Sequence, residues 1–122
     1  MLGRCSSLAV LNLAGNNMGA EGAGRLAGGL GQCSSLAELH LAYNHIGVHG
    51  AGRLAEVLGK CSSLAVLDLG HNAVRDEGAR RLAGVLGQCF SLANLHLTDN
   101  RIGADAMVLL QTSIRATTRL FV

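Results

Sequence analysis

Leucine recurs along the chain in a pattern of fixed spacing. Four segments of the form L-x-x-L-x-L-x-x-N begin at residues 8, 36, 64 and 92, so consecutive copies lie 28 residues apart. The two leucines that lie two residues apart point to the same side of an extended backbone, and the residue between them points to the other side. The pattern therefore predicts one short strand per copy, with a buried side and a solvent side.

The second half of each copy has the spacing of a helix. In the first copy, apolar residues at i, i+3, i+4 and i+7 form the stripe of an amphipathic helix at Ala23, Leu26, Ala27 and Leu30. Neither a strand nor a helix of this kind can bury its apolar side alone, so neighbouring copies must stack. We expect an α/β solenoid with a parallel sheet on the inner curve and helices on the outer curve.

The four strand motifs and their 28-residue period resemble the leucine-rich repeat family, and the helical second half is similar to its ribonuclease-inhibitor-like class. The resemblance implies a short right-handed horseshoe arc. We expect one domain over residues 1–122, with partial repeats at 1–4 and 117–122 and full repeats at 5–32, 33–60, 61–88 and 89–116. Members of this class include enzyme inhibitors, the sensing regions of nucleotide-binding innate immune receptors, and activators of Ran-type GTPases.

Asparagine and cysteine each occupy one position of every repeat. The asparagine side chains are expected to satisfy backbone groups in the turn after each strand, at Asn16, Asn44, Asn72 and Asn100. The cysteines lack the paired spacing of a disulfide framework. We interpret them as buried free thiols, at Cys5, Cys33, Cys61 and Cys89.

The positions between and after the leucines vary from copy to copy, while the rest of the repeat is nearly copied. Copies of one template that differ mainly on an exposed face indicate a binding surface, with neutral drift as the alternative. The predicted contact residues on the concave face are Glu38, His40, Tyr43, Asp68, His71, Asn94, His96 and Asp99. Tyr43 is the first choice because exposed aromatic side chains frequently anchor interfaces.

His40, Asp68 and His96 share the middle position of successive strands. This row of side chains has two interpretations, a metal site and a hydrogen-bonded polar row. The two histidines lie two strands apart, about 9–10 Å between backbones, whereas zinc needs ligand atoms within about 2.0–2.2 Å. The spacing favours the polar row, in which Asp68 pairs with the histidines, and the sequence predicts neither a metal nor a cofactor.

Arginine forms a separate column on the predicted helices, at Arg25, Arg53 and Arg81. A solvated helix face is the simpler interpretation of this column, and a contact site is the alternative. The chain carries none of the phosphate-loop, nucleophile-elbow or zinc-protease motifs. We therefore predict a non-enzymatic protein-binding scaffold. The alternatives are a GTPase-activating or enzyme-inhibiting regulator, with Arg75 and Arg101 in the loops, and a structural or designed array.

Composition and charge limit the classes of partner that the chain is expected to bind. The net charge is +2 and the ten basic residues are scattered, which argues against nucleic acid. No apolar run approaches the ~18–20 residues needed to span a bilayer, so we expect no membrane partner and a cytoplasmic location. The first repeat has no visible cap, and the last replaces the glycine and arginine pattern with Met107, Val108 and Leu109. Uncapped ends predict either a fragment of a longer array or homo-oligomerisation.

Overall fold

Strands and helices alternate along the chain. The computed structural model describes residues 7–122, so Cys5 lies outside the described residues. The described strands are β1 (Val10–Asn12), β2 (Glu38–His40), β3 (Val66–Asp68), β4 (Asn94–His96) and β5 (Arg119–Phe121). The described helices are α1 (Gly19–Leu30), α2 (Gly47–Leu58), α3 (Arg75–Leu86) and α4 (Ala104–Ser113). The predicted strand and helix of each repeat are confirmed.

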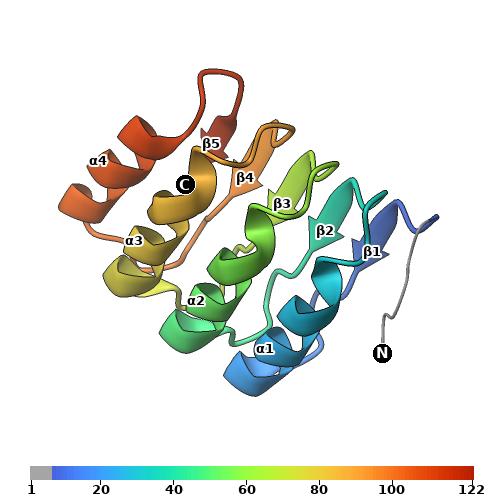
Figure 1. The fold of residues 1–122 in the computed structure, drawn as a ribbon. Coiled ribbons are helices and arrows are strands. Elements are labelled where there is room, and N and C mark those ends of the chain that lie inside the picture. The colour runs from blue at the N-terminus through green and yellow to red at the C-terminus, as the bar shows by residue number, and fades with distance from the viewer. Residues whose placement is uncertain (1–6) are drawn as a thin grey trace.

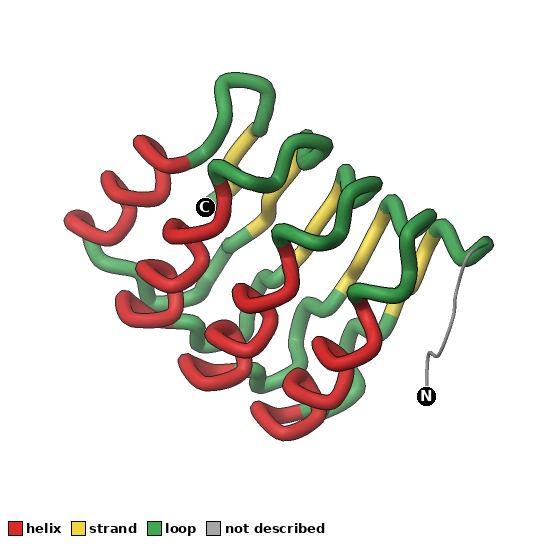
Figure 2. Tube along the Cα trace, viewed as in Figure 1, coloured by secondary structure: helices red, strands yellow, loops and turns green. Residues whose placement is uncertain are grey.

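The strands form one parallel sheet in chain order, from β1 to β5. All four helices lie on one side of this sheet, as Figure 1 shows, and each turn of the solenoid runs from strand to loop to helix and back (Figure 2). The predicted α/β leucine-rich repeat solenoid is confirmed. The helices cover the convex side, so the concave side of the sheet stays free for contacts.

The core lies between the sheet and the helices. The central leucines of β2, β3 and β4 (Leu39, Leu67 and Leu95) have no exposed surface. Their counterpart in β1, Leu11, is only partly buried, because no described strand lies beyond β1. Within residues 7–122, the central leucine of the edge strand β1 is therefore less buried than those of the inner strands.

The asparagines that recur at one position of each repeat form a ladder of hydrogen bonds between successive repeats. The Asn72 side chain is 1% exposed, and its Oδ1 accepts hydrogen bonds from the backbone N–H groups of Asn44 (2.8 Å) and Ile46 (3.3 Å). Its Nδ2 donates to the carbonyl oxygens of Leu41 and Leu69. The predicted structural role of these amides is confirmed. Asn44, Asn72 and Asn100 satisfy backbone groups of their own turn and of the preceding repeat, and Asn16 satisfies those of its own turn.

The last strand departs from the 28-residue period. Register pairs Val66 with Asn94, 28 residues on, but pairs Asn94 with Arg119, only 25 residues on. Residues 117–122 thus add a fifth strand to the sheet. The exposed apolar side chains Val108, Leu109, Phe121 and Val122 lie at this end of the chain. The segment extends the sheet and also leaves apolar surface uncovered.

Helix length sets one further limit. Within residues 7–122, every helix is too short and insufficiently apolar to cross a membrane.

Candidate binding surface on the concave face

Two sets of outward-facing residues make up the candidate surface. The strand set comprises the residues that flank the buried leucine of each strand, at Val10, Asn12, Glu38, His40, Val66, Asp68, Asn94 and His96. The loop set comprises the residues two positions after the third leucine of the strand motif, at Gly15, Tyr43, His71 and Asp99. The strand set is partly or fully exposed, as period-2 alternation requires.

The loop set forms a connected column across three repeats. The rings of Tyr43 and His71 stack with centroids 4.2 Å apart and planes 8° from parallel. On the next repeat, Asp99 Oδ2 lies 3.3 Å from His71 Nδ1. Tyr43 is 59% exposed, so the predicted exposure of this ring is confirmed, although its ring also packs on a neighbour. The leucine spacing predicts that these three side chains share one face, but it does not predict the stack or the ion pair.

The backbone under this column is left-handed. The φ angles are +59° at Tyr43, +56° at His71 and +54° at Asp99, and the first repeat has glycine at the equivalent position, Gly15, with φ +72°. Left-handed backbone costs a residue with a Cβ roughly 1–2 kcal/mol, and glycine escapes this cost. Three repeats thus hold a side chain at a position where the backbone favours glycine.

The strand set forms separate local contacts and not one polar row. His40 Nε2 lies 3.1 Å from Glu38 Oε1 on the same strand. The His96 ring stacks on Phe121, with centroids 4.4 Å apart. Asp68 Oδ1 accepts a hydrogen bond from the backbone N–H of Gly70 at 2.9 Å.

The predicted pairing of Asp68 with His40 and His96 is therefore wrong. An aspartate at the end of a strand can cap its own loop, and here Asp68 does so two residues away. The two histidines instead use an adjacent carboxylate and an aromatic ring. Within residues 7–122, no three His, Cys, Asp or Glu side chains are grouped in a way that could hold a metal ion.

The arginine column is satisfied within its own helices. Arg25 pairs with Glu21 at 3.1 Å, Arg53 with Glu56 at 3.6 Å, and Arg81 with Glu77 at 3.4 Å. These exposed pairs neutralise the column, which favours a solvated helix face over an anion site. Arg75 is the first residue of α3 and Arg101 lies in the loop after β4; both are exposed and have left-handed backbone.

The cysteines form a buried column at the end of each helix. The Sγ atoms of Cys61 and Cys89 each lie 3.5 Å from the carbonyl oxygen four residues earlier. Burial raises the pKa of both thiols, and the neighbouring Cys89 adds to the increase at Cys61. The prediction of buried free thiols is confirmed for Cys61 and Cys89, and the predicted burial is confirmed for Cys33.

Comparison with known proteins agrees with this architecture. The Leucine Rich repeat family matches residues 4–27, 32–55 and 60–83. No curated protein matches the sequence. Among solved structures, the chain resembles the Actin-Binding Site 2 of leiomodin-1, with a TM-score of 0.83 and 19% identity over 93% of this chain and 68% of that one. This identity supports a shared fold, and the matches do not assign a class within the family. The chain belongs to the leucine-rich repeat family.

Proposed function

We propose that the chain is a non-enzymatic scaffold that binds a protein partner through its concave face and the loops after its strands. The loop column of Tyr43, His71 and Asp99 carries this proposal. These side chains are adjacent in three successive repeats and are held on a left-handed backbone. Strained backbone of this kind clusters at functional sites, where the side chain has a use that offsets its cost.

The column offers a partner two kinds of contact. Tyr43 presents an exposed aromatic ring that is already oriented by its stack on His71, so little side-chain entropy remains to be lost on binding. Asp99 presents a carboxylate whose side chain is 72% exposed. A protein surface with an apolar patch beside a lysine or arginine would complement this pair.

Family membership supports the same class of function. Solenoids of this kind use their extended concave surfaces for binding. The leiomodin-1 domain is named for actin binding, so a neighbour of this fold serves as a protein-binding module.

Site-specific crosslinking tests the proposal. A photoreactive phenylalanine analogue at Tyr43 is expected to capture a partner in cells, whereas the same analogue at Arg53 on the convex helices is not. The captured protein is then purified and its affinity measured. We expect Tyr43→Ala to weaken binding at least about tenfold, as for an aromatic anchor, and Arg53→Ala to leave binding unchanged. Equal capture from both positions, or equal affinity of both variants, would contradict the proposal.

A further inference from the structure

The two faces of the Tyr43 ring have different surroundings. One face stacks on His71, with ring centroids 4.2 Å apart and planes 8° from parallel. Because the two residues occupy the same position of adjacent repeats, this stack runs along the direction in which the repeats follow one another. The opposite face of the Tyr43 ring therefore turns toward the first repeat.

Gly15 occupies the position of the loop set next to this second face. A Cβ added at Gly15 would meet no atom of residues 7–122 within 4 Å. The backbone of Gly15 is left-handed (φ +72°), like that of Tyr43, His71 and Asp99, which carry side chains at the equivalent position. The glycine at position 15 thus leaves an open space over its backbone, with the Tyr43 ring as one wall. We refer to it as the open space over Gly15.

The spacing of the repeats indicates that a planar group fits this space. Neighbouring parallel strands lie about 4.7–4.9 Å apart, and the rings of Tyr43 and His71 stack at nearly that distance. A flat group over Gly15 at the same spacing would contact the second face of Tyr43 as His71 contacts the first. An aromatic ring, a carboxamide and a guanidinium group all have this shape.

Charge favours the guanidinium among these planar groups. The strand and loop sets contain the carboxylates of Glu38, Asp68 and Asp99 and no lysine or arginine. Arg119, on β5, lies three strands away from β2. The whole chain has ten basic and eight acidic residues, so these two sets are acidic in a chain of net charge +2. The π face of a tyrosine ring also attracts cations.

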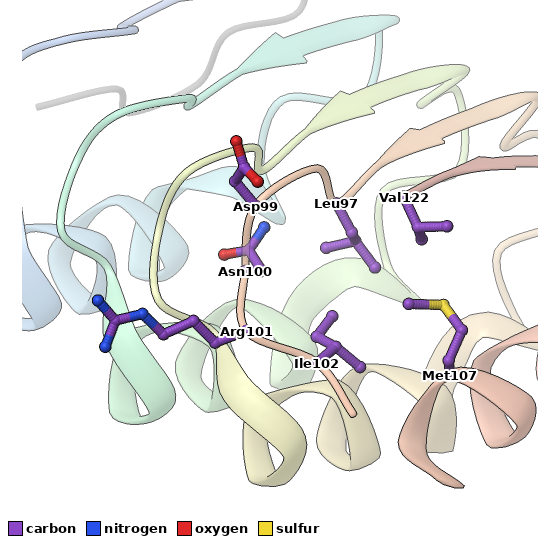
Figure 3. A pocket seen from close by; sticks show the side chains of 7 residues that line it. All are labelled: Leu97, Asp99, Asn100, Arg101, Ile102, Met107 and Val122. Carbon is purple, nitrogen blue, oxygen red and sulfur yellow. The ribbon is translucent and has the colours of Figure 1, made fainter. Parts of the chain in front are cut away.

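The carboxylate at the other end of the column is open to a cationic partner as well. Asp99 lies 3.3 Å from His71 Nδ1, and its side chain is 72% exposed. Figure 3 shows its carboxylate pointing away from Leu97 and Met107, two apolar side chains that line a hollow beside the same loop. The column therefore presents an exposed carboxylate in the fourth repeat and an aromatic face in the second.

We infer that the protein partner of the concave face places an arginine side chain in the open space over Gly15, with its guanidinium flat against the Tyr43 ring. This inference rests on the proposed function and specifies the residue type that this surface recognises. A guanidinium is planar and weakly hydrated, so it stacks on aromatic rings, whereas a lysine ammonium is a compact and strongly hydrated charge. Lysine is therefore the poorer occupant, although it carries the same charge.

Tyr43 provides its own spectroscopic probe, because it is the only tyrosine and the chain has no tryptophan. Blocked tripeptides with arginine, citrulline, lysine or phenylalanine between two glycines are titrated into the full chain at constant ionic strength. Tyrosine fluorescence and the ring-proton shifts of Tyr43 are recorded. Citrulline keeps the planar shape without the charge, and lysine keeps the charge without the planar shape. We expect the arginine peptide to bind about two- to fivefold more tightly than either, as for an exposed cation–π contact.

Two histidine substitutions in the same loop test the location. Gly15→His fills the open space, and the equivalent position of the third repeat already holds a histidine on left-handed backbone. We expect this variant to lose the preference for the arginine peptide. Gly19→His is the matched control, because Gly19 also has left-handed backbone (φ +71°) and nothing within 4 Å of an added Cβ. This control should keep the preference, and circular dichroism should show that both variants are folded.

Three results would overturn the inference: equal affinity of the arginine and citrulline peptides, a phenylalanine peptide that binds as tightly as the arginine peptide, or an arginine preference that survives Gly15→His. If any of them occurs while the photoreactive analogue at Tyr43 still captures a partner, the proposed function stands and only the arginine assignment fails. Absence of capture at Tyr43 would instead contradict the proposed function itself.

Discussion

At the scale of single residues, the buried asparagine side chains connect successive repeats by hydrogen bonds. Asn72 satisfies donors of the second repeat and carbonyls of both repeats from a buried position. Asn16, in the first repeat, is exposed, and within residues 7–122 its Nδ2 bonds to the carbonyl oxygens of Leu13 and Ala14 in its own turn. The same residue type is therefore expected to stabilise the chain more at the buried Asn72, which bonds to two repeats, than at the exposed Asn16.

We expect Asn72→Ala to destabilise the chain by about 3 kcal/mol or more, because the change leaves several buried backbone groups without partners. Asn16→Ala is expected to cost about 0.5–1 kcal/mol, since water can replace its exposed hydrogen bonds. Urea unfolding followed by circular dichroism measures both. Equal losses for the two variants would show that the ladder is not the source of the stability.

Backbone strain at Tyr43 gives a second residue-scale prediction. Both Tyr43→Ala and Tyr43→Gly remove the stack on His71, but only glycine relieves the left-handed backbone. The glycine variant should therefore be more stable than the alanine variant by about 1 kcal/mol. The comparison is made by thermal and urea unfolding. An alanine variant as stable as the glycine variant would remove the strain argument from the proposed site.

The sequence identified which residues face outward but not the contacts they make. Alternation of leucines was sufficient to place Tyr43, His71 and Asp99 on the concave side. It gave no sign of their left-handed backbone, because only Gly15 has a residue type that signals such a conformation. The pairing of His40 with Glu38 and not with Asp68 depends on loop geometry, since Asp68 is used by the N–H of Gly70.

At the scale of elements, the glycines in the helices fall into two kinds. A Cβ added at Gly78 would lie 2.6 Å from Val74 Cγ1 and 3.2 Å from Ala51 Cβ of the neighbouring helix. A Cβ added at Gly84, in the same helix, would meet nothing within 4 Å. Close approach of α2 and α3 thus explains the first glycine, whereas packing does not explain the second.

We predict opposite effects for alanine at these two positions. Gly84→Ala should stabilise the chain by about 0.5–1 kcal/mol, because alanine has the higher helix propensity. Gly78→Ala should destabilise it by about 1–3 kcal/mol through overpacking. The two variants share a helix and differ only in their surroundings, so the midpoints of urea unfolding test the argument directly. Stabilisation by both changes would mean that α2 and α3 can separate without cost.

The buried cysteines at the helix ends predict a pH dependence. Burial raises the folded-state pKa of Cys61 and Cys89 above that of a thiol in the unfolded chain. Unfolded thiols ionise first as pH rises, so the stability contributed by these groups is fully present below about pH 8.5 and is lost above it. We expect the urea concentration at the midpoint of unfolding to decrease as the pH is raised above about 8.5. A variant with Cys61→Ala and Cys89→Ala should show a smaller decrease.

Native alkylation with peptide mapping provides the chemical check on the same cysteines. Iodoacetamide should label Cys61 and Cys89 slowly at pH 8, and rapidly once urea unfolds the chain, because burial limits both access and the thiolate fraction. Rapid labelling of either residue in the folded chain would refute its placement in the core.

At the scale of the whole molecule, periodicity predicted the solenoid but not its last turn. Four motifs in register determine the strand order and the side on which the helices lie. Residues 117–122 lack the full motif, so neither the fifth strand nor its 25-residue offset could be derived from the repeat. The hydrogen bond from the Gly103 N–H to Asp76 could not be predicted either, because the equivalent N–H groups of the other loops donate to the following repeat.

The two ends of the array differ in surface chemistry, and this difference leads to a prediction about assembly. The C-terminal end exposes Val108, Leu109 and Phe121, and Leu109 stands where the earlier helices have Arg25, Arg53 and Arg81. Exposed apolar side chains favour association. We expect the mass from light scattering under reducing conditions to rise with concentration.

Leu109→Arg restores the charge of the arginine column at this end. This variant should lower the measured mass toward the 12.6 kDa of one chain, whereas Arg25→Lys, which keeps the charge in α1, should behave like the original sequence. Association that Leu109→Arg leaves intact would show that Leu109 is not part of the contact. A constant 12.6 kDa mass at all concentrations would show that the apolar end does not self-associate, and would leave its surface available to a different partner.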